Sequence, residues 1–408
     1  MGKPKSKDAK RPGLVFLIAI LSCAAPIGMD LYLPSVPDMP AYFGTTEAVI
    51  NLTLVCFFAF MSVGTLIFGP LSDRSGRKPI LILTVSINTA AAAIGAIAPN
   101  VWILIAARIV QGIGGGGMGA VAMAVVKDTF EGERRAHVLV VMQALTAIAP
   151  MVAPVAGSAI LMFTNWRGTF VAQALVGAAC LIGVLIISES LPKEERNDIG
   201  VFRSIGRLFV VGRNKGFTIP LLIFSVSSFT GMCYIAGVSY VYMDFFGLPK
   251  MMYSVLFAIT AGASIVGTFL VIPVSKRFTI RQLTVFVFGF CIVAGAGLLV
   301  FGWTSPFVYF GIMVLYMLIN VLIRPITTNL LLDQQDGDTG SASSLMNFTH
   351  GIFGSFGMLY DSLPWKTHII SLGTNVGGMS AIALISWFIL MRSKVVIRNL
   401  DGPGKDKN

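Results

Sequence analysis

Long apolar runs and short polar connections alternate along the whole chain. A helix needs about 20 apolar residues to cross the hydrocarbon core of a bilayer. Twelve runs reach that length or come close to it, so the pattern predicts an all-α membrane protein with twelve membrane-spanning helices. The predicted spans are 14–38, 47–71, 79–98, 101–126, 138–162, 166–188, 217–244, 250–274, 281–302, 306–332, 341–362 and 367–391.

One longer polar stretch, residues 189–216, interrupts this alternation midway along the chain. We interpret it as a cytoplasmic linker between an N-terminal six-helix bundle at 1–188 and a C-terminal six-helix bundle at 217–408. Within 202–209, apolar residues alternate with arginines, which is typical of an amphipathic helix lying on a membrane surface. The two interpretations are compatible.

The composition excludes an ordinary soluble protein. Of the 408 residues, 55% are hydrophobic and 12% are charged, and the mean hydropathy is +0.81. A soluble core of this size needs a charged surface that the sequence does not supply. In a soluble protein the net charge of +11 would suggest nucleic acid as a partner, but basic cytoplasmic loops explain it in a membrane protein. We therefore expect no nucleic-acid partner.

The distribution of cations predicts the orientation. With the N-terminus inside, 25 of the 30 Lys and Arg residues fall in segments that face the cytoplasm. Cytoplasmic loops of membrane proteins carry such an excess, so we expect both termini in the cytoplasm. The basic N-terminus followed by an apolar run resembles a signal peptide. The run is too long for one and further spans follow it, so we interpret it as a retained first span.

Motifs of other protein classes are weak or absent. The five cysteines all lie in apolar runs without CxxC spacing, so we expect neither disulfides nor metal ligands. A GxGxxG match at 112–117 lies inside a predicted span, where close helix packing explains it better than a nucleotide-binding loop. No catalytic motif appears, so we expect no enzymatic activity, no cofactor and no metal.

The two halves are related by spacing. Arg77 and Arg281 are 204 residues apart, and Asp128 and Asp333 are 205 apart. Two parallel six-helix repeats around a central site are the architecture of alternating-access transporters. The spacing from Arg108 to Arg324 is 216 residues, so that match is loose.

Asp30 and Arg108 are charged residues within predicted spans. A charge at the centre of a span costs roughly 2.5–3.5 kcal/mol on insertion scales, so each needs a reason. Counted from the outer ends of their spans, Asp30 lies about 12 Å deep and Arg108 about 10 Å deep. We expect them to face a common cavity as partners, with a carboxyl group that binds and releases a proton. A fixed ion pair that locks two helices is the alternative.

Further ionisable residues lie in the second half. Asp244 and Asp361 are near the outer ends of their spans, where we expect water to solvate them. His350 is a candidate second proton site, although a hydrogen-bonded structural role is the simpler interpretation.

A charged hinge, residues 69–79, separates the second and third predicted spans. Asp73, Arg74 and Arg77 lie in it, and Asp128 lies at the end of the fourth span. These four residues could form a cytoplasmic switch that stabilises one state of a transporter. Alternatively, the cations only set the topology.

At these residues the sequence resembles a known family. Gly69-Pro70-Leu71-Ser72-Asp73-Arg74-Ser75-Gly76-Arg77-Lys78 resembles the GxLxDRxGRK signature of the major facilitator superfamily. Residues 29–37 resemble the drug/proton antiporters of the bicyclomycin and chloramphenicol/florfenicol type, and 104–112 matches the motif that carries their membrane arginine, here Arg108. Residues 153–158 resemble the antiporter motif GPxxGG, with Ala153 and Ser158 in place of glycines.

The resemblance implies roles for several residues. Arg77 would pair with Asp128, and Asp73 would face a helix N-terminus of the second half. Gly69 and Gly76 would permit a close helix approach and a tight turn. The antiporter-motif residues that would bend the fifth helix or bring it close to the eighth are Pro150, Pro154 and Gly157. The candidate substrate-binding residues are Met29, Asp30, Arg108, Met142, Thr146, Tyr234 and Phe257.

We therefore predict a multi-pass transporter of the bacterial cytoplasmic membrane that exports apolar or amphipathic small molecules in exchange for protons. Its expected partners are the small-molecule substrate, protons and the lipid bilayer, and we expect a monomer. A dedicated exporter of a cell metabolite such as a siderophore, nucleoside or amino acid is the alternative. A membrane sensor or scaffold is disfavoured by the short terminal tails, and a channel by the lack of a charged ring.

Overall fold

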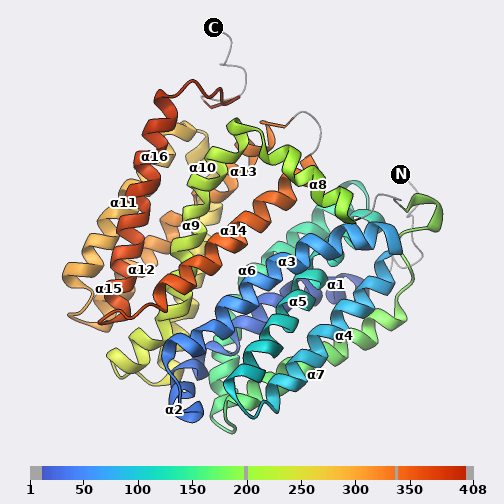
Figure 1. Cartoon of the computed structure of the whole chain (residues 1–408), viewed down its shortest axis with the longest axis horizontal. Coiled ribbons are helices and arrows are strands. Elements are labelled where there is room, and N and C mark those ends of the chain that lie inside the picture. Colours follow the sequence, from blue (N-terminus) through green and yellow to red (C-terminus); the bar gives the residue numbers. More distant parts are fainter. Residues whose placement is uncertain (1–11, 197–200, 336–338, 401–408) are drawn as a thin grey trace. The chain divides into compact units, whose positions relative to one another are not determined.

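The computed structural model describes residues 12–196, 201–335 and 339–400, and these segments are helical throughout, without a strand (Figure 1). The chain divides into two compact units, 1–205 and 206–408. The boundary falls within the predicted linker 189–216. The helix α8, Val201–Gly212, spans this boundary, so the prediction of a helix in the linker is confirmed.

Unit 1 contains the first six predicted spans. Its elements are α1 (Pro12–Asp30), the 3-10 helix η2 (Leu33–Asp38), α2 (Met39–Phe43), α3 (Glu47–Ser75), α4 (Arg77–Ala96), α5 (Val101–Thr129), α6 (Gly132–Leu161), α7 (Trp166–Ile186) and the short η3 (Lys193–Glu195). Helix N-termini in this unit carry the expected caps, since the side chains of Thr46, Asn100 and Asn165 accept from the first turns of α3, α5 and α7.

Unit 2 contains the remaining six. Its elements are α9 (Lys215–Tyr240), the π-helix η4 (Val241–Phe245), α10 (Lys250–Ser275), α11 (Ile280–Phe301), α12 (Pro306–Asn320), α13 (Ile323–Leu332), α14 (Thr339–Asp361), α15 (His368–Thr374), the π-helix η5 (Asn375–Met379) and α16 (Ser380–Arg392). Several predicted spans are therefore divided into shorter helices, as α12 and α13 divide the run 306–332.

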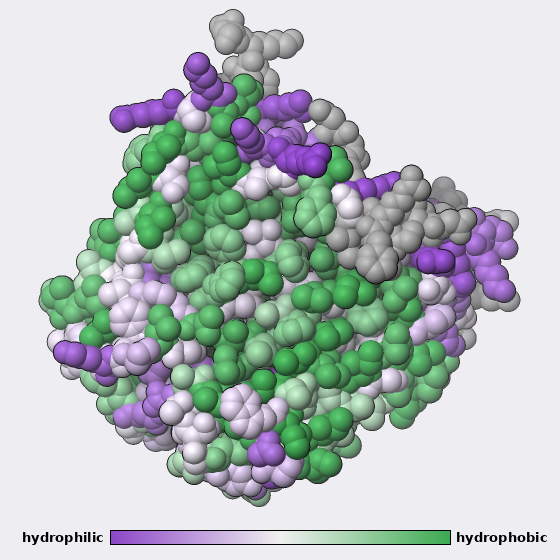
Figure 2. Space-filling view, in the orientation of Figure 1, coloured by the Kyte–Doolittle hydropathy of each residue, from purple (hydrophilic) through white to green (hydrophobic). Residues whose placement is uncertain are grey.

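Ten helical segments of the described chain are long and apolar enough to cross a membrane by themselves. The bent pair Gly13–Ala24 and Pro26–Phe43, with an angle of 47°, brings the number to eleven. The remaining predicted span, 341–362, corresponds to α14, which is helical but rich in Ser, Thr and Gly. Large hydrophobic side chains such as Trp102 and Phe269 are exposed, and hydrophobic residues cover most of the surface seen in Figure 2, as contact with lipid requires.

The glycine-rich segment of α5 brings three helices of unit 1 into close contact. A Cβ atom at Gly112 or Gly116 would collide with a backbone carbonyl of α3, and one at Gly114 would meet the backbone of α4. Only glycine allows backbones to approach so closely, so the prediction of close helix packing is confirmed. This packing fixes α5, and with it Arg108, against its neighbours.

Candidate functional site

Asp30 is the last residue of α1 and lies inside the first predicted span. Its side chain is buried, with 4% of the residue exposed. The carboxyl group forms no hydrogen bond or ion pair with any residue that the structure describes. A buried acid without a partner is unusual in a folded protein, because isolated charges are costly to remove from water.

Arg108 in α5 is fully buried, yet its guanidinium is well supplied with partners. Its Nη1 donates to the carbonyl oxygen of Gly28 at 2.8 Å and to Oε1 of Gln111 at 2.8 Å. Its Nε donates to the carbonyl oxygen of Thr53 at 3.3 Å. The guanidinium carbon also lies 4.1 Å from the ring centroid of Phe57. Carbonyl dipoles and an aromatic face thus stabilise the charge where no carboxylate does.

The predicted partnership of Asp30 and Arg108 is therefore wrong in its direct form, because no ion pair joins them in this structure. Depth along a helix can be read from a sequence, but direction around its axis is less certain. Residues two positions apart project about 200° from one another on a helix. Arg108 reaches the backbone of α1 at the carbonyl oxygen of Gly28 instead of the carboxyl group of Asp30.

Sequence reasoning missed two glutamines that extend the network of Arg108. Nε2 of Gln111 donates to Oε1 of Gln173 in α7 at 2.7 Å, and Nδ2 of Asn88 in α4 donates to the carbonyl oxygen of Gln111 at 3.2 Å. Both glutamines and Asn88 line a cavity of about 20 Å³, roughly the size of one water molecule. A signal for Gln111 was present, since it lies one helical turn after Arg108 on the same face.

Tyr32 completes the surroundings of Arg108. It is fully buried, its hydroxyl lies 3.2 Å from Oγ1 of Thr53, and its ring centroid lies 5.2 Å from the guanidinium carbon. The ring also packs against Phe170 of α7 at 5.2 Å. The arginine is thus enclosed by residues from α1, α3, α5 and α7 and the segment after α1.

The antiporter-motif residue Gly157 packs beside Asp30. A Cβ atom at Gly157 in α6 would collide with the carbonyl oxygen of Leu31, the residue that follows Asp30. Pro150 and Pro154 lie within α6, two turns and one turn before this contact, respectively. The motif therefore brings the backbone of α6 directly against the end of α1, within unit 1.

The predicted substrate-binding residues are mostly buried. Met29 and Met142 are 5% and 2% exposed, and Met142 belongs to the apolar core of unit 1. In unit 2, Tyr234 stacks on Phe257 with ring centroids 6.0 Å apart, and both are buried. Thr146 is only partly buried, and its Oγ1 lies 3.9 Å from the sulfur of Cys23. The substrate role of these residues stays a prediction.

The predicted pair of Arg77 and Asp128 is confirmed. Nε of Arg77 donates to Oδ2 of Asp128 at 2.7 Å, and its Nη1 lies 2.5 Å from Oδ1 of Asp73. The same Nη1 donates to Oγ of Ser72 at 2.7 Å. We call Ser72, Asp73, Arg77 and Asp128 the charged cluster. Arg74, which was predicted to belong to it, is exposed and has no side-chain contact of this kind with a residue that the structure describes.

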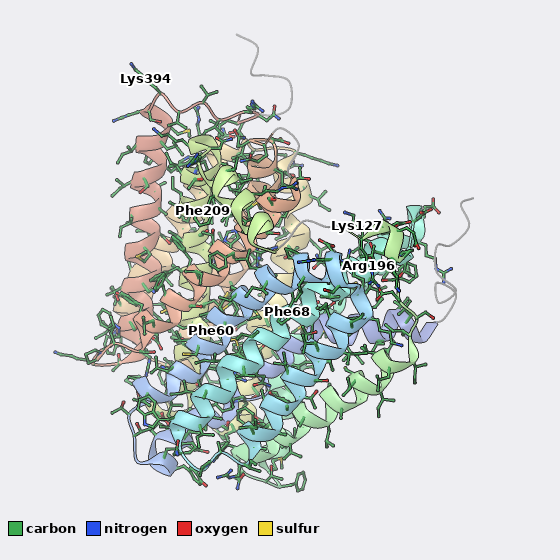
Figure 3. The ribbon with its side chains drawn as sticks, turned by 45° about the vertical axis from the view of Figure 1, so that its right-hand side comes forward. Phe60, Phe68, Lys127, Arg196, Phe209 and Lys394 are labelled. Atoms are coloured by element: carbon green, nitrogen blue, oxygen red, sulfur yellow. The ribbon has the colours of Figure 1, made fainter. Side chains whose placement is uncertain are left out.

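Glu189, just after α7, is a member of this region that sequence reasoning did not identify. Its Oε1 accepts from the backbone N of Arg77 at 2.8 Å and its Oε2 from the backbone N of Lys78 at 3.2 Å, so it caps α4. Arg196 lies 3.7 Å from the same carboxylate. Figure 3 shows Arg196 at the same end of unit 1 as Lys127, the neighbour of Asp128.

The two glycines of the hinge differ. Gly76 has a φ angle of 101°, which L-residues rarely adopt, and a Cβ atom there would crowd Arg196. The predicted tight turn is thus confirmed. Gly69 has open space where a Cβ atom would lie, so the predicted close helix approach is not found there.

Asp361 in unit 2 was predicted to be solvated, and that prediction is wrong. The residue is 1% exposed, and its Oδ2 lies 2.9 Å from Nδ1 of His368. The imidazole stacks on Tyr240 with ring centroids 4.7 Å apart. Helix α15 begins with His368 soon after α14 ends at Asp361. The short connection between the two helices therefore brings the imidazole next to the carboxyl group.

The model of the Major Facilitator Superfamily matches residues 18–358. The chain belongs to the major facilitator superfamily. It is therefore a transporter of the type that crosses the membrane many times, and members of this superfamily are in general not enzymes.

Two relatives of this chain align with it over different lengths. It is 26% identical over 397 residues to the MFS-type transporter YdgK of Bacillus subtilis (strain 168), which covers 96% of this chain and 98% of YdgK. It is 29% identical over 245 residues to the multidrug resistance protein MdtL of Escherichia coli O9:H4 (strain HS). That match covers 60% of this chain and 62% of MdtL.

Solved structures of the superfamily share the fold at low sequence identity. The peptide transporter POT in complex with sulfate has a TM-score of 0.73 at 15% identity, covering 96% of this chain and 94% of POT. The human organic anion transporter MFSD10 has a TM-score of 0.67 at 15% identity, covering 93% of this chain and 100% of that one. These similarities concern the fold alone.

Proposed function

We propose that this transporter carries out proton-coupled efflux of apolar or amphipathic small molecules across the cytoplasmic membrane by alternating access. The observation that supports this most is the buried Asp30, an acid inside a span without a partner. The similarity to MdtL, a multidrug resistance protein, and the motifs at 29–37 and 153–158 favour the same substrate class.

Asp30 is the proposed proton-binding residue. A charged carboxylate without a counter-ion costs several kcal/mol in a span, and binding of a proton removes that cost. In a state that opens Asp30 to water the proton can leave, because water solvates the charge. Exposure to alternate sides would thus let one acid take up a proton outside and release it inside.

Arg108 is proposed to position α1 rather than to exchange protons. Its donors hold the carbonyl oxygen of Gly28, two residues before Asp30, and Gly157 of α6 packs against the residue after it. Asp30 therefore lies between two fixed contacts. A change in its charge would act on both α5 and α6 through the backbone of α1.

The charged cluster is proposed to stabilise one state of the cycle. Arg77 binds two carboxylates at once, and such charge-assisted hydrogen bonds are about twice as strong as neutral ones. Because Asp73 and Asp128 lie at the ends of α3 and α5, a rearrangement at these helix ends during the cycle would break these contacts. Contact of Asp73 with the second half stays a prediction.

The driving force is sufficient for export. One proton contributes roughly 2.3 kcal/mol per 100 mV of membrane potential and about 1.4 kcal/mol per pH unit. We propose one proton per cycle, because Asp30 is a single buried acid without a partner.

The test is proton flux in proteoliposomes that hold a pre-set pH gradient, before and after addition of apolar drugs. We expect drug addition to collapse the gradient with the parent protein and with Asp38→Asn, a matched change at an exposed acid of the same segment. Asp30→Asn should abolish the response. An equal response from Asp30→Asn would assign the proton to another residue, and transport without any proton flux would refute coupling.

A further inference from the structure

Arg324 is the second arginine inside a span, and its setting differs from that of Arg108. It lies in α13 within the candidate span Pro306–Leu332, eight residues before the end of that span. This spacing places its backbone about 12 Å from that end. The side chain is nevertheless exposed. A guanidinium in contact with lipid hydrocarbon is costly, so an exposed one at this depth requires water or a polar ligand.

The backbone around Arg324 is held in place. Pro325 has no N–H, so the carbonyl of Val321 cannot receive its usual helical hydrogen bond, and α12 ends at Asn320. Nδ2 of Asn320 donates to the carbonyl oxygen of Ser227 at 3.2 Å, which fixes this break against α9. Arg324 therefore projects from a defined position.

Its charge has no partner in the described parts of the chain. The carbonyl oxygen of Arg324 accepts from Thr327 and Thr328, but its guanidinium forms no hydrogen bond or ion pair there. An arginine side chain offers five N–H donors in a planar fork. The acid closest in sequence, Asp333, is exposed and accepts from Asn399 at 3.0 Å instead.

Helix α14, which contacts α13, carries the ionisable residue His350, which adds no negative charge. His350 is 6% exposed, and its Nδ1 has no hydrogen-bond partner among the described residues. Ser228 of α9 donates to its backbone carbonyl at 2.8 Å, so α9 and α14 pack together there. Neither the guanidinium of Arg324 nor Nδ1 of His350 thus has a hydrogen-bond partner in the described parts of the chain.

We propose that Arg324 recognises an anionic group of the transported molecule, such as a carboxylate or sulfonate. This inference rests on the proposed function and narrows its substrate class to amphipathic molecules with an acidic group. The fork of a guanidinium matches the two oxygens of such a group. Arg108 is unsuited to this purpose because it is fully buried and its Nε and Nη1 already bind carbonyl oxygens, which leaves only Nη2 without a partner.

A matched pair of probes tests the inference. Dansyl-leucine carries one carboxylate, and its methyl amide has the same apolar body without the charge. Binding of each to the full-length protein in phosphatidylcholine nanodiscs is measured by dansyl fluorescence, with competition by the unlabelled compound. The parent should prefer the carboxylate. Arg324→Gln should lose about tenfold in affinity for the carboxylate and less than twofold for the amide.

Two control variants separate recognition from general effects of charge. Arg324→Lys keeps the charge without the fork and should retain part of the preference. Arg277→Gln removes an exposed cation elsewhere in unit 2 and should behave as the parent. An equal loss for both probes in Arg324→Gln, or a parent without preference, would overturn the proposal.

An anionic lipid headgroup presents the same chemistry as an acidic substrate. Nanodiscs that contain one third phosphatidylglycerol separate the two sources. A parent that keeps its preference for the carboxylate supports a substrate site, whereas loss of the preference there assigns Arg324 to lipid and overturns the proposal. The proposed proton coupling is tested separately by the proton-flux assay with Asp30→Asn, which uses apolar drugs without an acidic group. A negative result in one assay is therefore distinguishable from a negative result in the other.

Discussion

Arg108 in unit 1 and Arg324 in unit 2 each place a positive charge inside an apolar span, but only Arg108 is buried among partners. Two backbone carbonyls, a glutamine and an aromatic ring surround its guanidinium. Arg324 is exposed and has no side-chain partner in the residues described. An intramembrane charge is therefore not by itself a substrate site: a buried arginine that binds backbone carbonyls holds helices together, whereas an exposed one is available to a ligand.

The charged residues at corresponding positions of the two units differ in a similar way. Arg77 and Asp128 form an ion pair in unit 1. Their spacing counterparts in unit 2, Arg281 and Asp333, are both exposed, and Asp333 accepts from Asn399 rather than from Arg281. A repeated sequence pattern has thus kept its interactions in one half and lost them in the other.

We expect the largest difference in stability between two variants that each lose an arginine charge, Arg108→Gln and Arg324→Gln. Arg108→Gln would leave the carbonyl oxygens of Gly28 and Thr53 without their donor, at about 1–3 kcal/mol for each unsatisfied group. We expect a clear fall in the thermal unfolding temperature of the purified protein and loss of transport. Arg324→Gln should unfold as the parent does. Equal destabilisation by both changes would remove the distinction.

Gly157→Ala probes how firmly unit 1 holds Asp30. The added Cβ would collide with the carbonyl oxygen of Leu31, and overpacking of this kind costs about 1–3 kcal/mol. We expect proton-coupled transport to fall several-fold, as measured in proteoliposomes. Gly119→Ala is the control, since no atom lies within 4 Å of its Cβ position. Full activity of Gly157→Ala would show that this contact is dispensable.

A double-mutant cycle compares the two charged ends. Arg77→Gln and Asp128→Asn should couple by about 1 kcal/mol in unfolding free energy, because the residues are in direct contact. The same cycle on Arg281 and Asp333 should give no coupling. A coupling of similar size in unit 2 would mean that the second pair forms in another state of the transporter.

The smallest effect is expected at the caps of α4 and α11. Glu189 caps α4 from a distant part of the chain, whereas α11 begins with its own capping box of Thr279 and Gln282. Glu189→Gln should weaken the first turn of α4 by about 0.5 kcal/mol. Hydrogen exchange of the first amides of α4 should become faster, while those of α11 stay unchanged. An unchanged exchange rate in the first turn of α4 would indicate that the charge of Glu189 contributes little to the stability of that turn.

Much of the fold could be predicted from the sequence. The apolar runs correspond to helices because hydrocarbon requires every backbone polar group to be satisfied within its own segment. The pair of Arg77 and Asp128 was implied by the resemblance of residues 69–78 to a family signature, and the structure contains it. Glu189 could not be assigned in this way, because its contact with α4 depends on where the chain leaves α7.

The candidate site was less predictable for physical reasons. Distance along a run gives the depth of Asp30 and Arg108 but not the direction of their side chains, so the direct pair was predicted wrongly. The position of Asp361 near the end of a run suggested solvation, whereas the turn into α15 brings His368 to it. The buried positions of Met142 and Tyr234 reflect side-chain packing that no spacing reveals.

The most direct test of the account compares exchange with proton-driven transport in Asp30→Asn. Exchange of labelled for unlabelled drug across proteoliposomes needs the carrier to reorient but needs no net proton movement. We expect Asp30→Asn, which puts a neutral carboxamide of similar shape in place of the acid, to keep exchange near the parental rate and to lose accumulation driven by a pH gradient. Gradient-driven accumulation equal to that of the parent would contradict the assignment of the coupling proton to Asp30.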